Sequence, residues 1–349
     1  LTALRAQYLG YELINKNPIA ASVSSKGFAI DTALFVHNDE EVLVHGTIGF
    51  DNSVSATLAA ENFSFADIHY FITSPDFRQS TLQLGGTLNA EVILSGTLSE
   101  PVFQNTIVGN DLAFRESKFG YCTGSIRYAE KRAEVEFQLV HSIQQDSIKN
   151  IVLKGIVPID LSLTSVENRT AIEGMDVALQ TANLQFGIFD PFIPEIDRIT
   201  GMLQAKIHCT GSLQHPQFHG DTHLSGGKFV FSMNGMTYNA EGSLLFDGTR
   251  ISFPAFSIHN KNHDYGNGLV RVGGSISMLG FVPHEYHLSA NGELMVLQEK
   301  IRNSNQLFYG DLVAATGTDG LHFDGTSERS RVSGLILVKQ ASLTFPPLQ

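Results

Sequence analysis

Apolar and polar residues alternate along most of the chain. Val42, Val44, Gly46, Ile48 and Phe50 stand at every second position, with polar or small residues between most of them. Side chains of a strand point alternately to its two faces, so this pattern predicts strands with one apolar and one polar face. The same period recurs at Val54–Ala60, Leu88–Leu94, Val135–Leu139, Tyr238–Phe246 and Tyr286–Ala290.

Short turn signals separate these runs, and helical spacing is scarce. Asn234-Gly235, Asp247-Gly248 and Asp324-Gly325 are typical of tight turns between strands. Two stretches, 64–80 and 184–198, break the alternation, and we expect a short helical turn or compact loop in each. The polar stretch 259–268 is expected to be an exposed loop. The sequence therefore predicts an all-β chain with few or no helices.

One pattern occurs twice. Residues 86–103 read GTLNAEVILSGTLSEPVF, and residues 201–218 read GMLQAKIHCTGSLQHPQF. Each copy is an alternating strand, a glycine break and a proline-marked turn into another strand. The identical pairs are Gly86/Gly201, Leu88/Leu203, Ala90/Ala205, Gly96/Gly211, Leu98/Leu213, Pro101/Pro216 and Phe103/Phe218.

The repeat suggests one continuous structure rather than separate domains. We expect a single repeat-built β domain over residues 1–349, with units at about 27–150, 151–290 and 291–349. The third unit is degenerate, because it lacks the proline turn. Since the chain starts at Leu1 and ends in a strand without a stop signal, we expect a fragment of a longer protein.

Charge and hydropathy exclude several classes of partner. The 349 residues hold 23 Lys and Arg against 35 Asp and Glu, a net charge of −12. This balance argues against nucleic acid or an anionic membrane surface as the main partner, because both require basic patches. No apolar run is long enough to predict a transmembrane helix.

Two cysteines, Cys122 and Cys209, are too few for a disulfide framework and wrongly spaced for a zinc site. The alternation places Cys209 with Leu203, Ala205 and Ile207, and Cys122 with Ile126 and Tyr128. Both therefore face the apolar side. The prediction is two buried free thiols, with a long-range disulfide as the alternative.

The clearest candidate for a metal site is His219-x-Asp221-x-His223. In a strand these side chains project from one face, but the alternation assigns the apolar face to Phe218 and Leu224. The polar row then lies outside, and a flat row cannot surround one ion. His259, His263 and Asp264 are assigned to the polar loop. No motif for a nucleophile, a phosphate or a carboxylate pair is present, so we expect no metal, no cofactor and no enzymatic activity.

The apolar face needs a cover. Two sheets of a sandwich or the coil of a closed solenoid would cover it from within, whereas a sheet that curls without closing leaves an apolar trough. Acyl chains suit such a trough, because each buried methylene contributes roughly 0.8 kcal/mol without directional demands. The residues predicted to line it are Leu88, Ala90, Val92, Leu94, Leu98, Phe103, Leu203, Ala205, Ile207, Leu213, Phe218, Leu224, Phe229, Phe231, Leu244 and Phe246.

The repeated phrase G-x-L-x-A-x-[VI]-x-x-[ST]-G-[ST]-L-x-x-P-x-F resembles the C-terminal domain of the TamB family. Residues 219–260, with their LLFDGTRISF strand pair, and the closing segments 301–325 and 333–347 are similar to that domain as well. The resemblance covers most of the chain from about residue 40. It implies an elongated β-taco, an open U-shaped β-solenoid groove built from a parallel sheet with an apolar interior.

The resemblance also implies a function and a place. TamB belongs with the AsmA-like bridge-type lipid transfer proteins of the Gram-negative cell envelope. The family is anchored in the inner membrane by an N-terminal helix absent here, spans the periplasm, and works with the outer-membrane barrel TamA. The implied function is a non-enzymatic conduit that carries phospholipid acyl chains between the membranes and supports outer-membrane protein assembly. The alternatives are a structural β-solenoid or adhesin segment with a packed core, and a solenoid enzyme acting on polysaccharide.

Overall fold

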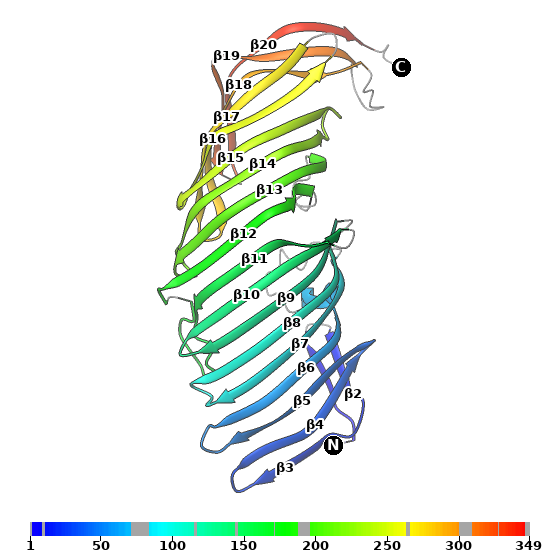
Figure 1. The fold of residues 1–349 in the computed structure, drawn as a ribbon, viewed down its shortest axis with the longest axis vertical. Helices are drawn as coiled ribbons and strands as arrows, with labels where there is room; N and C mark the ends of the chain where they lie inside the picture. The colour runs from blue at the N-terminus through cyan, green and yellow to red at the C-terminus, as the bar shows by residue number, and fades with distance from the viewer. Residues whose placement is uncertain are drawn as a thin grey trace. The chain divides into compact units, whose positions relative to one another are not determined.

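A computed structural model describes residues 2–8, 11–70, 84–114, 117–143, 146–170, 172–187, 196–262, 266–299, 309–326 and 328–345 (Figure 1). They fold into two compact units. Unit 1 comprises Leu1–Leu179 and Thr210–Gln214, and unit 2 comprises Gln180–Cys209 and His215–Gln349. The prediction of three repeat-based units stays a prediction.

Strands make up almost all of both units. The first eleven are β1 (Arg5–Tyr8), β2 (Tyr11–Asn15), β3 (Ala20–Ser24), β4 (Gly27–His37), β5 (Glu40–Gly49), β6 (Val54–Ser64), β7 (Leu84–Gly96), β8 (Pro101–Phe114), β9 (Ser117–Ala129), β10 (Arg132–Ile143) and β11 (Asp146–Pro158). The others are β12 (Met175–Gln185), β13 (Ile196–Gly211), β14 (Pro216–Phe231), β15 (Thr237–Gly248), β16 (Arg250–Asn262), β17 (Gly266–Leu279), β18 (Val282–Leu297), β19 (Tyr309–Thr326) and β20 (Ser330–Thr344).

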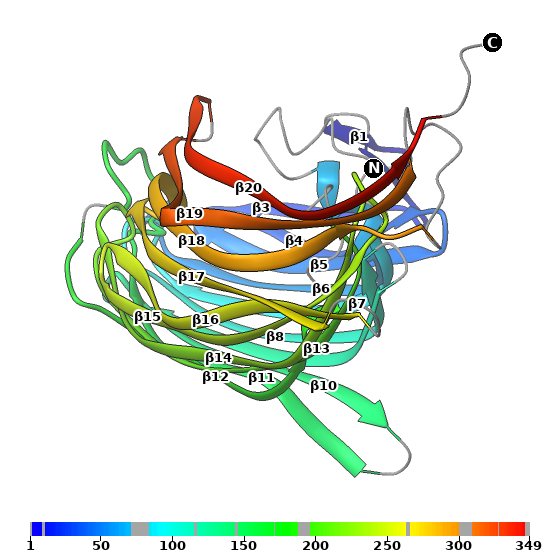
Figure 2. The ribbon, with the colours of Figure 1, turned by 90° about the horizontal axis from the view of Figure 1, so that it is seen from above.

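Successive strands pair with each other, and the pairing is antiparallel. In unit 1 the ladder runs from β4 through β11, with β2 and β3 both paired to β4 and β1 paired to β2. In unit 2 it runs from β14 through β20. The sheet is open and does not close into a barrel. Figure 2 shows that the strands of each unit bend along their length. The expectation of an all-β, open, β-taco-like groove is confirmed.

The parallel sheet implied by the resemblance is wrong. Short turns connect many of the successive strands, and a strand that returns through a tight turn pairs antiparallel, whereas a parallel partner needs a long crossover. The longer connection from β6 to β7 also joins antiparallel strands. The turn from β9 to β10 shows this clearly. Glu130 and Lys131 have φ angles of 51° and 61°, which is the left-handed backbone of a two-residue hairpin turn.

The stretches that break the alternation have the expected character where the structure describes them. Residues 64–80 contain η1, a 3-10 helix at Phe65–Tyr70, and residues 186–187 form a short 3-10 turn. The rest, 71–83 and 188–195, lies outside the described residues. The expected loop 259–268 is wrong at both ends, because β16 continues to Asn262, with Asn260 buried, and β17 begins at Gly266.

The two copies of the repeat adopt the same local structure. Gly96 ends β7 with a φ of 94°, and Gly211 ends β13 with a φ of 92°. Pro101 and Pro216 then begin β8 and β14. This backbone is unfavourable for residues with a Cβ, so glycine at both positions allows the chain to leave one strand and enter the next.

Each unit has a local buried cluster. In unit 1, Leu112, Cys122 and Leu139 pack together, with Phe65 of η1 against them. In unit 2, Met236, Tyr238, Met295 and Val313 form a second cluster. Among the described residues, no helix has the length and apolar character to cross a membrane.

Candidate functional site

One mainly apolar face runs across unit 1 from β4 to β11. Partners in an antiparallel ladder point to the same face, so chains of partners trace that face from strand to strand. One such chain links Val44 to Leu58, Val92, Asn105 and Ile126. The same registers continue to β4 and β11. Among the described residues in these registers, glycines, Asn105 and the terminal pair His37 and Glu40 interrupt this unit 1 apolar face.

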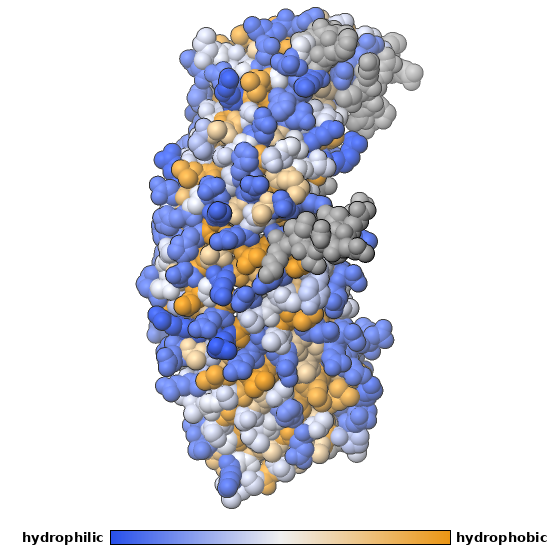
Figure 3. Space-filling model, in the orientation of Figure 1, coloured by the Kyte–Doolittle hydropathy of each residue, from blue (hydrophilic) through white to orange (hydrophobic). Residues whose placement is uncertain are grey.

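The opposite face of the same strands is mostly polar. Exposed residues follow one another on this face: Gln104 pairs with Arg127, and Arg127 pairs with Glu134. Glu91 of β7 lies on the same face and is also exposed. Ile93 is an apolar exception and is 44% exposed. Figure 3 shows hydrophilic residues with smaller apolar patches between them on the side seen in Figure 1. The alternation in the sequence thus corresponds to a real separation of faces.

The structure brings together most of the residues predicted for unit 1. Leu88, Ala90, Val92 and Leu94 lie on the unit 1 apolar face, and Phe103 is the partner of Leu94. Leu98 does not lie on it. It sits in the turn after β7, where its carbonyl accepts a hydrogen bond from the Leu163 amide at 2.7 Å.

Part of the unit 1 apolar face is open to solvent. Phe28 is 54% exposed, Ile48 48%, and Ile30 and Leu58 40% each. Phe28 and Ile48 are direct partners, and Leu58 follows through Val44 on the same face. A cluster of large apolar side chains at this exposure is unusual on a surface that contacts only water.

A loop of residues 159–170, which follows β11, borders this face at one end of β8 to β11. The Leu161 amide donates a hydrogen bond of 2.8 Å to the buried Tyr128 hydroxyl. An open hollow of about 580 Å³ lies between the loop and the face. Its lining residues are Val92, Phe103, Asn105, Ile126, Tyr128, Leu161, Ser162, Leu163 and Arg169. The Oδ1 of Asn105 is buried there without a hydrogen-bond partner.

Charged groups hold the loop in place. Arg169 donates hydrogen bonds to the carbonyls of Asp160 and Ser162, at 2.7 and 2.8 Å. The Asp160 carboxylate accepts one from the Ser162 amide and pairs with Lys131 at 2.9 Å. These donors lower the pKa of Asp160 to about 2. These hydrogen bonds and the ion pair therefore stabilise one conformation of the loop.

Unit 2 carries a similar face. Along β13, Leu203, Ala205, Ile207 and Cys209 are less exposed than the residues between them. Further predicted residues share a face across β14 and β15. The partners are Phe218 with Gly248, Gly220 with Phe246, Thr222 with Leu244, and Leu224 with Gly242. Leu213 lies in the turn after β13 instead.

Two predicted residues of unit 2 are part of a closed core. Phe229 and Phe231 pack against Met236, Tyr238 and their neighbours. The Tyr238 hydroxyl donates a hydrogen bond to the Met295 carbonyl, which brings β18 over β15. At this end of unit 2, protein side chains cover the apolar face.

The histidine row lies on the outer side, as predicted. His219 and His223 pair with Asp247 and Ser243, whereas Phe218 and Leu224 occupy the other face. His263 and Asp264 lie outside the described residues, and His259 is in β16 rather than in a loop. Both cysteines are buried and free. Burial raises the pKa of the Cys209 thiol to about 11.

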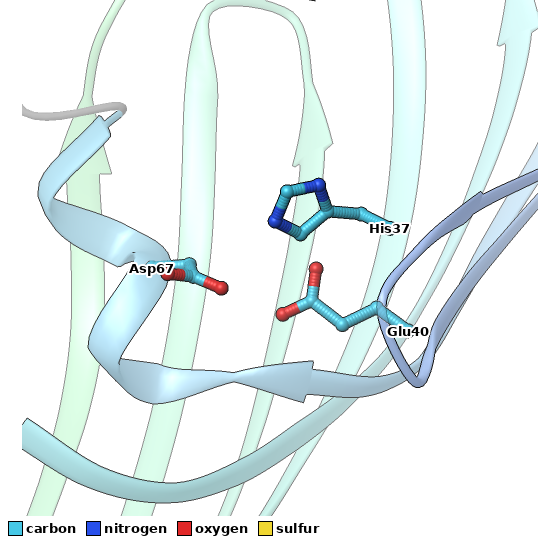
Figure 4. A group of neighbouring side chains, drawn as sticks. All are labelled: His37, Glu40 and Asp67. Carbon is cyan, nitrogen blue, oxygen red and sulfur yellow. The ribbon is translucent and has the colours of Figure 1, made fainter. Parts of the chain in front are cut away.

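Sequence reasoning missed one polar cluster. His37, Glu40 and Asp67 meet at one end of the unit 1 apolar face (Figure 4). The spacing of His37 and Glu40 around a turn is the only local signal. Nothing in the sequence connects them to Asp67, because the contact depends on the position of η1.

No protein-family model, curated protein or solved structure matches this chain.

Proposed function

We propose that the chain is a non-enzymatic lipid-binding segment whose apolar faces hold acyl chains. The observation that carries the proposal is the unit 1 apolar face, which is continuous from β4 to β11 and leaves Phe28, Ile30, Ile48 and Leu58 at least 40% exposed. A lipid chain would cover these side chains, and each methylene buried would contribute roughly 0.8 kcal/mol.

The form of the face suits a chain-like ligand. An antiparallel ladder presents rows of side chains at a strand spacing of about 4.8 Å, without walls between one strand and the next. A flexible acyl chain can follow such a surface, whereas a rigid ligand would need a shaped pocket. A polar group at the border, the exposed ammonium of Lys131, would remain in water near a head group.

The resemblance to TamB extends the proposal. In that setting the segment would carry phospholipids through the periplasm of a Gram-negative bacterium and support outer-membrane protein assembly. Its partners would be phospholipid acyl chains, a TamA-like barrel and the inner membrane, but not nucleic acid.

The closed core of unit 2 supports a second candidate. Met236, Tyr238, Met295 and Val313 are buried together, as in a structural solenoid or adhesin segment. In such a protein the apolar faces serve only folding. The two candidates predict different contents for the purified protein.

The test is mass spectrometry of lipids extracted from the purified chain. Lipid binding predicts phospholipid at a reproducible molar ratio, which survives gel filtration and is displaced by a competing fatty acid. A delipidated sample should then regain lipid from vesicles. Protein that never contains lipid and takes up none from vesicles would overturn the proposal and favour the structural candidate.

A further inference from the structure

His37, Glu40 and Asp67 each bring one ligand atom to a common point, and these atoms lie within 4.8 Å of one another. His37 ends β4, Glu40 begins β5, and Asp67 belongs to η1 (Figure 4). His37 and Glu40 are also register partners across the hairpin. The hairpin therefore sets two of the side chains, and the 3-10 helix supplies the third.

The imidazole is held by a group outside the cluster. Its Nδ1 lies 2.6 Å from the Glu12 carbonyl oxygen. A carbonyl only accepts hydrogen bonds, so Nδ1 carries a proton, and in the neutral imidazole the lone pair is on Nε2. Histidine ligands of metals are commonly oriented by this kind of second hydrogen bond.

The Glu40 carboxylate is also held from outside. Glu40 is only 3% exposed. Its Oε1 accepts a hydrogen bond of 2.6 Å from the Ser64 amide, and its Oε2 accepts one from the Tyr11 hydroxyl. Each carboxylate oxygen has two lone pairs, so both oxygens retain one for a cation.

Apart from His37 itself, the described residues offer the two carboxyl groups no cationic partner. Within the part of the chain that the structure describes, no lysine or arginine forms an ion pair with Glu40 or Asp67. The centroid of the Tyr11 ring lies 4.3 Å from that of the His37 ring and 6.0 Å from that of the Phe63 ring. One side of the cluster is therefore aromatic. Two adjacent carboxylates in such surroundings are costly unless a cation or a shared proton lies between them.

We propose that His37, Glu40 and Asp67 bind one divalent transition-metal ion of the Zn²⁺ type. One imidazole and two carboxylates are normal zinc ligands, whereas Ca²⁺ and Mg²⁺ prefer oxygen alone. Bonds of about 2.0–2.2 Å in a tetrahedral site place ligand atoms roughly 3.4 Å apart. Because the three atoms now lie within 4.8 Å of one another, the cluster closes by at most about 1.4 Å on binding. Water takes the fourth position.

Metal binding has a structural consequence for the unit 1 apolar face. Asp67 lies in the same 3-10 helix as Phe65, which packs against Leu112, Cys122 and Leu139. The ion would tie this helix to the β4–β5 hairpin. It would thereby keep Phe65 packed over that end of the unit 1 apolar face.

The test uses the full chain after treatment with a chelator and removal of the chelator. Titration with Zn²⁺ alone in a calorimeter should show one tight equivalent, and Co²⁺ should give a visible absorption band. Asp67→Asn and His37→Gln should each weaken Zn²⁺ binding at least tenfold. The matched control is His287→Gln, because His287 is also a histidine beside two carboxylates, but on an exposed surface. Its Nδ1 lies 2.9 Å from Asp324 Oδ1, and its Nε2 lies 3.5 Å from Glu285 Oε1. It should leave the tight equivalent unchanged.

Thermal unfolding separates a metal site from a merely structural cluster. Without metal, Asp67→Asn should raise the melting temperature, because it removes one of two adjacent carboxylates. The same variant should lose the rise that Zn²⁺ produces in the wild type. Absence of a tight Zn²⁺ equivalent in the wild type would overturn the proposal, and so would an equal loss of binding in His287→Gln. The result is independent of whether the chain binds lipid.

Discussion

Leu58 of β6 and Val92 of β7 lie directly opposite each other on the unit 1 apolar face, while the next pair, Thr57 and Ile93, lies on the other face. Leu58 is 40% exposed and Ile93 is 44% exposed. The two residues therefore differ in the face they occupy but hardly in their exposure. This makes them a matched pair for asking what the apolar face does.

Leu58→Glu should greatly reduce the lipid that accompanies the protein, because it places a charge among the acyl chains. Ile93→Glu should leave the lipid unchanged, and both variants should change the free energy of unfolding by about 1 kcal/mol or less. Lipid extraction and urea unfolding measure the two effects. If both variants lose lipid equally, or neither does, the apolar face is not the binding surface.

Gly96→Ala should destabilise unit 1 by about 1–2 kcal/mol. Gly96 has a φ of 94°, and an added Cβ would lie 2.5 Å from the Glu100 carbonyl oxygen. Gly85→Ala on the same strand is the control, because its nearest neighbour would be the Ala113 Cβ at 3.5 Å. Urea unfolding of the two variants should separate them. Equal stabilities would show that the backbone at Gly96 tolerates a side chain.

The loop at the border of unit 1 should lose stability in acid. The folded-state pKa of Asp160 is lowered to about 2, chiefly by the Ser162 amide and by Lys131. A lowered pKa means that the ionised carboxylate stabilises the fold above the unfolded value of about 3.9. That stabilisation disappears as the pH falls from about 4 to 2. Asp160→Asn should therefore be less stable than the wild type at pH 7, and the difference should shrink over this interval in urea unfolding.

Both thiols should be unreactive in the folded protein. Burial raises the pKa of Cys122 and of Cys209, so little thiolate is present at neutral pH. Iodoacetamide should label neither cysteine in buffer and both in concentrated urea. Peptide mass spectrometry measures the labelling at each site. Fast labelling of Cys122 in buffer would show that the cluster with Leu112 and Leu139 opens readily.

The sequence by itself determined the strands and their faces. Alternation at Leu88–Leu94 and at Leu203–Cys209 predicts which side chains share a face, because the period of two is a local property of an extended chain. Gly96 with Pro101, and Gly211 with Pro216, likewise predict the breaks between strands. The outward position of His219 and His223 follows from the same period.

Only the tertiary structure decided how the strands pair and what covers their apolar faces. The parallel sheet implied by the resemblance is replaced by an antiparallel ladder, because short turns return the chain beside itself. Phe229 and Phe231 are partly buried against a cluster that includes Met295, which is far away in the sequence. The meeting of Asp67 with His37 and Glu40 depends on where η1 packs. Such contacts leave no periodic trace in the sequence, because they join segments whose separation along the chain is arbitrary.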